Sequence, residues 1–88
     1  MSNKETLLEF PCQFPIKAMG RNAADFEAVV VELVRRHVPD LGEGAVQSRD
    51  SKGGNYIAVT VTITARSQAQ LDAIYQELTA CEHVVMAL

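Results

Sequence analysis

The sequence predicts an α+β fold: a ferredoxin-like βαββαβ sandwich with a four-stranded antiparallel sheet and two helices on one face. Three observations lead to this prediction, namely a long alternating strand, two amphipathic helical segments, and turn residues that separate them. A chain of 88 residues has room for one hydrophobic core. We therefore expect a single domain over residues 1–88, with residues 1–9 as a loosely ordered or edge-covering segment.

The first part of the chain predicts a strand followed by a helix. The strand starts close to Phe14 and runs to Gly20, with prolines near its beginning, where they are tolerated. We expect Asn22 to be the N-cap of the helix and Pro39 to end it. Mostly apolar residues recur between them at three- and four-residue steps, as in a helix that buries one face: Phe26, Val29, Val30, Leu33, Val34 and finally His37.

The middle of the chain predicts a hairpin. A short polar strand from Ala45 to about Arg49 belongs at a sheet edge, and the apolar strand from Asn55 to Ala65 belongs nearer the middle. Residues 51–55 form the turn between them. The second strand has two faces, because successive side chains alternate. One face carries Ile57, Val59, Val61 and Ile63, and the other carries Tyr56, Ala58, Thr60, Thr62 and Thr64.

The end of the chain predicts a second helix and a last short strand, Val84 to Leu88. Ser67 is the expected N-cap of this helix, and its apolar stripe is Leu71, Ile74, Tyr75 and Leu78. An apolar edge strand needs cover. The segment with Leu7, Leu8 and Phe10 would provide it, and so would a symmetric homodimer; the residues do not choose between the two.

Composition restricts the classes of function. Eight Lys and Arg against eleven Asp and Glu give a net charge of −3, which makes nucleic acid an unfavoured partner. The first ten residues lack the pattern of a signal peptide, and no apolar stretch approaches the roughly 18 residues of a membrane span. The two cysteines, Cys12 and Cys81, have no disulfide-scaffold spacing, so we expect a cytoplasmic protein with reduced thiols.

The first strand–helix turn, Gly20-Arg21-Asn22, is one candidate ligand site. A helix N-terminus offers free N–H groups to an anion, and Arg21 could hold a carboxylate or phosphate. Gly20 would allow a ligand to approach the backbone closely. A purely structural interpretation, in which Gly20 makes the turn and Asn22 caps the helix, is favoured on these residues alone.

The hydroxyl-rich face of the long strand is a second candidate site. It would bind a partner protein through Lys17, Arg49, Tyr56, Thr60 and Thr62. The alternative is an RNA-binding domain that uses the same face with Lys52. RNA-recognition motifs stack bases on several aromatic residues, whereas only Tyr56 is aromatic here, so the alternative is the weaker prediction.

No catalytic or metal-binding motif is predicted. Cys81 and His83 lack the paired ligand spacing of structural zinc sites. Cys12 has no activating group near it in the sequence. We therefore expect a protein that is not an enzyme and has no cofactor.

Several short motifs occur in a fixed order along the chain: Phe10-Pro11, Phe14-Pro15-Ile16-Lys17-Ala18-Met19-Gly20, Ser51-Lys52-Gly53 before Asn55-Tyr56, and Gln70-Leu71-Asp72-Ala73-Ile74-Tyr75-Gln76-Glu77-Leu78. In this order and spacing they resemble the YbeD-like family of small bacterial proteins, over about Leu8 to Leu88. The resemblance implies a fold similar to ACT regulatory domains, which bind amino acids near the first strand–helix turn and commonly pair as dimers. Family members are often encoded beside lipoate-attachment genes, which implies a role around lipoate metabolism.

These observations together predict a non-enzymatic regulatory or adaptor module with an ACT-like fold. It would act through a small-molecule ligand or a protein partner. An RNA-binding domain on the open sheet face is the alternative.

Overall fold

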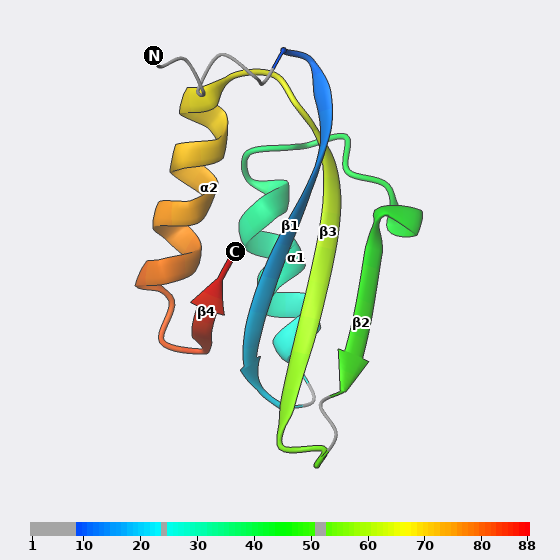
Figure 1. Cartoon of the computed structure of the whole chain (residues 1–88), viewed down its shortest axis with the longest axis vertical. Helices are drawn as coiled ribbons and strands as arrows, with labels where there is room; N and C mark the ends of the chain where they lie inside the picture. The colour runs from blue at the N-terminus through cyan, green and yellow to red at the C-terminus, as the bar shows by residue number, and fades with distance from the viewer. Residues whose placement is uncertain (1–8, 24, 51–52) are drawn as a thin grey trace, which may run out of the picture.

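The computed structural model describes residues 9–23, 25–50 and 53–88, and its elements follow the predicted order. A short 3₁₀ turn, Glu43–Ala45, is the one addition among these residues. The strands and helices, labelled in Figure 1, are β1 (Cys12–Arg21), α1 (Phe26–Arg35), β2 (Val46–Asp50), β3 (Tyr56–Ala65), α2 (Gln68–Ala80) and β4 (Val84–Ala87).

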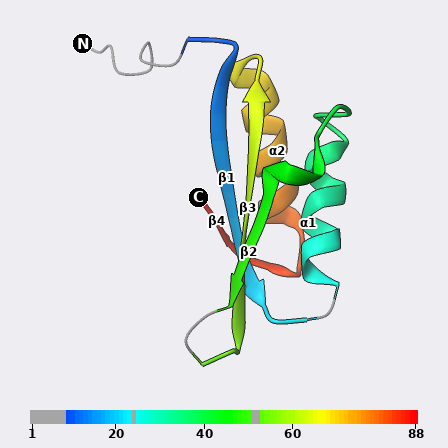
Figure 2. The ribbon, with the colours of Figure 1, turned by 90° about the vertical axis from the view of Figure 1, so that its right-hand side faces the viewer.

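The four strands form one antiparallel sheet in the order β2-β3-β1-β4. The polar β2 lies at an edge and the apolar β3 lies inside, as their compositions predict. Seen from the side in Figure 2, both helices lie on one side of the sheet and leave the other face uncovered. The predicted α+β fold is therefore confirmed.

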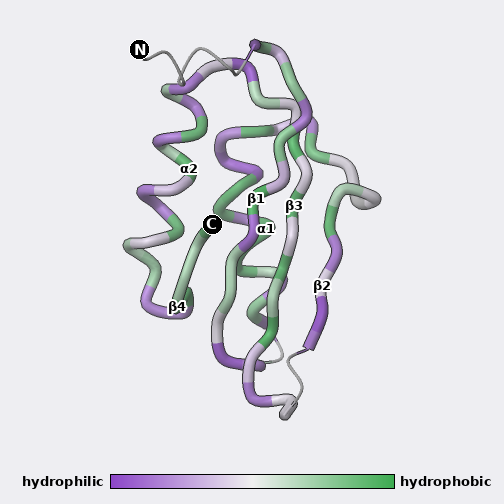
Figure 3. Tube along the Cα trace, in the orientation of Figure 1, coloured by the Kyte–Doolittle hydropathy of each residue, from purple (hydrophilic) through white to green (hydrophobic). Residues whose placement is uncertain are grey.

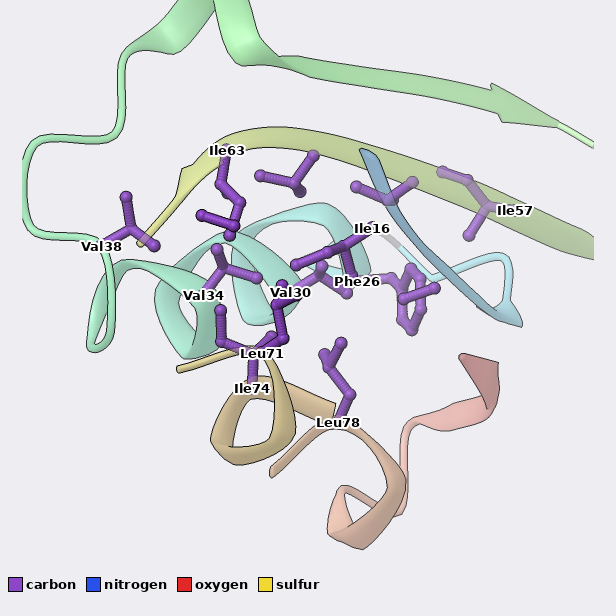
Figure 4. Close-up of a cluster of buried hydrophobic side chains, with 14 residues drawn as sticks. Ile16, Phe26, Val30, Val34, Val38, Ile57, Ile63, Leu71, Ile74 and Leu78 are labelled. Atoms are coloured by element: carbon purple, nitrogen blue, oxygen red, sulfur yellow. The ribbon is translucent and has the colours of Figure 1, made fainter. Parts of the chain in front are cut away.

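The alternation in β3 separates a buried face from an open one. Its apolar residues at odd positions are buried against the helices, while Thr60 and Thr62 on the other face stay partly exposed. Figure 4 shows the buried side chains of the strands meeting those of both helices. The core consists of Ile16, Ala18, Phe26, Val30, Val34, Val38, Ile57, Val59, Val61, Ile63, Ala65, Leu71, Ile74 and Leu78.

The second helix forms as predicted. The Ser67 hydroxyl accepts a hydrogen bond from the Gln70 backbone N–H at 3.1 Å, which caps the helix. The Tyr75 hydroxyl donates to the Leu88 carbonyl oxygen at 2.7 Å and so ties α2 to the end of β4. Burial raises the pKa of this hydroxyl, which keeps the proton that the bond needs.

The predicted cap of the first helix is wrong. The residue at the N-cap position is Asp25, whose side chain makes no capping bond. Asn22 instead bonds to the far end of the hairpin: its backbone N–H donates to the Asn55 carbonyl and its side-chain amide to the Gly54 carbonyl, both at 3.0 Å. Because β1 continues to Arg21, Asn22 still lies beside the sheet and cannot cap α1.

Several strand boundaries also differ from the predictions by one or two residues. The first strand begins at Cys12 rather than near Phe14, because pairing with β3 extends to the Cys12–Ala65 pair. The second strand begins at Val46, since Ala45 belongs to the 3₁₀ turn.

The long strand β1 has an outer edge that β4 covers only in part. Lys17 and Leu88 exchange backbone hydrogen bonds of 3.1 and 2.8 Å, and the pairing ends there. Backbone groups alternate in direction along a strand, so Pro15 is the next residue whose amide would face this edge. Proline has no N–H to offer, which discourages further strand addition.

Some predictions fall on residues that the structure does not describe. Leu7 and Leu8 are among them, and so are Ser51 and Lys52 of the predicted hairpin turn. Phe10, by contrast, packs against the core. Neither helix in the described ranges is long and apolar enough to cross a membrane.

Candidate functional site

The strand register arranges the uncovered face of the sheet in rows. In one row, Gln47 of β2 and Lys17 of β1 flank Thr60 of β3. The next row is more apolar and crosses all four strands: Arg49, Ala58, Met19 and Met86. We call the outward-facing residues of these strands the open face. The predicted interaction residues Lys17, Arg49, Tyr56, Thr60 and Thr62 all lie on it.

A hollow lies on the open face where the short side chain of Ala58 stands among longer ones. Its volume is about 250 Å³, and Lys17 and Arg49 line it together with Gln47, Ala58 and Thr60. A smaller hollow of about 140 Å³ adjoins it, shares Arg49 and Ala58, and is also lined by Met19, Tyr56 and Asp50. We call the larger one the β2–β1 hollow. It brings together Lys17, Arg49 and Thr60, three of the predicted interaction residues.

The open face is cationic although the chain has a net charge of −3. Alternation along the described strands places Lys17, Arg21 and Arg49 on this face. It places no Asp or Glu of these strands there, because Asp50 pairs with Ile57 and so belongs to the covered face. The side chains of Lys17 and Arg49 are exposed, and neither makes an ion pair with another described residue. These two cations are therefore available to an external anion.

The β4 edge of the sheet presents apolar side chains to solvent. Val85 and Leu88 are each 62% exposed and Met86 is 49% exposed. Figure 3 shows the hydrophobic colouring along β4, which contrasts with the hydrophilic lower part of β2. Met86 and Leu88 pair with Met19 and Lys17, so they border the open face.

The first strand–helix turn offers less room than its sequence suggests. A Cβ atom on Gly20 would lie 2.3 Å from the His83 carbonyl oxygen and 2.4 Å from Cε1 of Phe26. The protein itself therefore occupies the space that we predicted for a ligand. The side-chain amide of Asn22 is engaged with Gly54. Gly20 is buried and Asn22 is engaged, so Arg21 is the predicted residue of this turn that stays exposed. Its side chain makes no hydrogen bond or ion pair with another described residue.

A hollow of about 130 Å³ lies beside Arg21. Asp25 and Glu82 line it as well, together with Phe26 and His83, so carboxylates stand near the guanidinium group. Binding sites for small molecules usually enclose about 300–1,000 Å³. This hollow is small by comparison and offers little cover for a free ligand.

One polar cluster was not predicted from the sequence. His37, just past the end of α1, lies with its Nε2 atom 2.5 Å from Oε2 of Glu77 in α2, and Arg36 donates to the other carboxylate oxygen at 3.1 Å. The bond from His37, together with the charge of Arg36, lowers the pKa of Glu77 below its usual value. The partners are 40 residues apart, so no local pattern could have identified the pair.

This cluster joins the two helices on the covered side of the sheet. Gln70 adds a hydrogen bond of 2.9 Å from its side-chain amide to the His37 carbonyl oxygen. Among the residues in the described ranges, no group of three or more His, Cys, Asp and Glu side chains could hold a metal ion. Cys12 and Cys81 are both free thiols.

Comparison with known proteins identifies the family. The family described as "Protein of unknown function (DUF493)" matches residues 5–88. The chain belongs to this family. The match extends over nearly the whole chain and confirms the resemblance to YbeD-like proteins that the motifs indicate.

Proteins named "UPF0250 protein" in several bacteria are similar in sequence to this DUF493 chain. The protein from Chromobacterium violaceum is 49% identical over 85 residues, which is 97% of this chain and 96% of the relative. The one from Neisseria gonorrhoeae is 45% identical over 86 residues, covering 98% of this chain and 94% of the relative. The one from Ralstonia nicotianae is 44% identical over 85 residues, covering 97% of this chain and 88% of the relative.

A solved structure supports the fold. The solution structure of protein HP0495 from H. pylori is similar to this DUF493 chain with a TM-score of 0.72, and the match covers 97% of this chain and 89% of that one. The two sequences are 16% identical, so this likeness concerns the fold alone.

Proposed function

We propose that this DUF493 chain is a non-enzymatic adaptor or regulatory module that binds a partner protein through the open face of its sheet. One observation carries the proposal: Lys17 and Arg49 line the same uncovered hollow without a partner among the described carboxylates. Arginine and methionine side chains are enriched at protein-binding surfaces, and Arg49, Met19 and Met86 lie together on this face.

The size of the two hollows on the open face favours a partner protein over a free small molecule as the ligand of this face. The β2–β1 hollow, at about 250 Å³, is below the usual range for ligand pockets of about 300–1,000 Å³. It is large enough for one or two side chains of a partner that makes its remaining contacts on the surrounding strands. Met86 and Leu88 extend this surface along the β4 edge.

The composition of the open face favours protein over RNA. Single-stranded nucleic acids bind such sheets by stacking bases on aromatic side chains. The central row here has Met19 and Ala58 on the two inner strands, and Tyr56 is the aromatic residue at its margin. A cationic hollow without a stacking platform suits carboxylates better than bases.

Photocrosslinking in the native host tests the proposal. The photoreactive residue p-benzoylphenylalanine replaces Thr62 on the open face, or Gln76 on the exposed side of α2 as the matched control. We expect discrete crosslinked products with other proteins from the Thr62 position and far fewer from the Gln76 position. Mass spectrometry of the products identifies the partner and its contacting peptide.

The crosslinks also separate the alternatives. Equal patterns from the two positions, or no product from Thr62, would remove the support for an open-face function. Adducts with RNA would favour the RNA-binding alternative. Products in which Thr62 is joined to a second copy of the same chain would indicate a homodimer, which is one of the two ways in which the apolar last strand could be covered.

The lipoate connection implied by the YbeD-like resemblance is a separate part of the proposal. We expect the amount of lipoylated protein, measured by immunoblotting, to change when the gene is deleted. Wild type should restore it and a Lys17→Glu variant should not. Unchanged lipoylation would remove this part and leave the adaptor function as it stands.

A further inference from the structure

The distribution of charge restricts what the open face can bind. On α1, α2 and the loops the described carboxylates outnumber the arginines, which are Arg35, Arg36 and Arg66, whereas the cations of β1 and β2 face the opposite way. At physiological salt, charges are screened beyond about 8 Å. A long polyanion would meet the acidic surroundings as well as the hollow, whereas a short acidic segment can stay within the hollow that Lys17 and Arg49 line.

The two cations stand on either side of a gap. Lys17 belongs to β1 and Arg49 to β2, and β3 runs between them, so the flanking strands are roughly 10 Å apart. Ala58 and Thr60 form the floor of this gap. A carboxylate placed there can accept charge-assisted hydrogen bonds from the ammonium group of Lys17 and the guanidinium group of Arg49.

An apolar contact lies at a defined step from this gap. Met19 follows Lys17 by two residues on the same face, about 6.6 Å along the strand. Met86 of β4 pairs with Met19 and is 49% exposed. An extended segment repeats its side chains on one face with the same two-residue step.

We infer that the partner protein docks an extended acidic segment on the open face, with an Asp or Glu side chain between Lys17 and Arg49. An apolar residue two positions away contacts Met19 and Met86. This inference rests on the proposed function of the open face and adds the chemistry of the partner to it. A clamp of two cations around one carboxylate also makes binding sensitive to salt.

Nuclear magnetic resonance with defined peptides tests the inference. The probe is the peptide acetyl-Ala-Glu-Ala-Leu-Ala-Glu-Ala-amide, and the matched control has Gln at both Glu positions. We expect the acidic peptide to shift the amide signals of Lys17, Arg49 and Ala58, with an affinity that falls as salt is raised. The Gln peptide should bind at least tenfold more weakly.

Charge reversal in the protein provides the second control. Lys17→Glu and Arg35→Glu change the net charge equally, but Arg35 lies on α1. We expect Lys17→Glu to weaken peptide binding tenfold or more and Arg35→Glu to change it less than twofold. The folded state of each variant is checked by its amide spectrum.

Three results would overturn the inference: no shift with the acidic peptide, equal shifts with the Gln peptide, or shifts confined to the helices. Oligouridylate that shifts the open face while the acidic peptide does not would also overturn it. If crosslinks from Thr62 persist in any of these cases, the partner-binding function stands and the acidic chemistry alone is wrong.

Discussion

The imidazole of His37 lies 2.5 Å from the carboxylate of Glu77 and joins the end of α1 to α2. Arg36 contacts the same carboxylate. Its Nη2 atom also lies 3.7 Å from Oε2 of Glu32, which makes an i, i+4 ion pair with a residue of α1. The two helices that cover the sheet are thus connected by a polar cluster at their surface in addition to the apolar contacts beneath. We expect this cluster to make the stability of the fold depend on pH.

The pH dependence follows from the lowered pKa of Glu77. Since this carboxyl is more acidic in the folded protein than in the unfolded chain, its stabilising effect is complete above the unfolded pKa of about 4.5 and is lost as the pH falls through the folded pKa. We expect the free energy of unfolding to decrease on acidification below about pH 5, and Glu77→Gln to reduce that decrease. Urea unfolding of wild type and Glu77→Gln at a series of pH values measures both free energies of unfolding.

The control for this prediction is Glu82→Gln, because Glu82 is exposed and makes no ion pair with another described residue. Its pH profile should follow that of the wild type. Parallel profiles for wild type and Glu77→Gln would show that the His37–Glu77 contact does not contribute to the pH dependence.

Gly20 should be the glycine that is most sensitive to substitution by alanine. The added methyl group would meet the backbone oxygen of His83 at 2.3 Å, and a backbone atom cannot move aside cheaply. We expect Gly20→Ala to lower the free energy of unfolding by about 1–3 kcal/mol, the usual cost of overpacking. Gly42→Ala is the control, because no atom lies within 4 Å of its added methyl group. Similar urea midpoints for the two variants would contradict the packing role of Gly20.

The alternation in β3 was sufficient to predict which face of the sheet is buried. Val59 and Val61 are completely buried, and Thr60 between them is not. The polar composition of β2 likewise placed it at an edge. These features depend on the spacing of apolar and polar residues along each strand, because apolar side chains are buried and polar ones are not. They can therefore be derived from local sequence.

The candidate site depends on contacts that the sequence does not encode locally. Asn22 looked like a helix cap, but its partner Gly54 is 32 residues away and competes successfully for its amide. Lys17 and Arg49 come to line one hollow only because both of their strands pair with β3 in a particular register. The residues of the face were predicted, whereas the hollow that Lys17 and Arg49 share required the register.

The two faces of β3 should differ sharply in their tolerance of truncation. Ile63→Ala removes a buried side chain that is 1% exposed, and we expect a loss of about 2–5 kcal/mol in the free energy of unfolding. Thr62→Ala on the open face should cost less than about 1 kcal/mol. Chemical denaturation compares the two. Equal losses would mean that the open face is buried in solution, for example by a second copy of the chain.

The N-caps of the two helices should also differ, because only one of them uses its side chain. The Ser67 hydroxyl bonds to the Gln70 N–H, whereas the Asp25 side chain makes no such bond. We expect Ser67→Ala to destabilise the protein by about 1 kcal/mol and Ser67→Gly by only a few tenths, since glycine leaves the helix end open to water. Asp25→Ala should cost less than Ser67→Ala, because it removes only a favourable charge near the helix dipole. Thermal unfolding of the three variants at one pH tests this order, and a larger loss for Asp25→Ala would mean that its side chain caps α1 in solution.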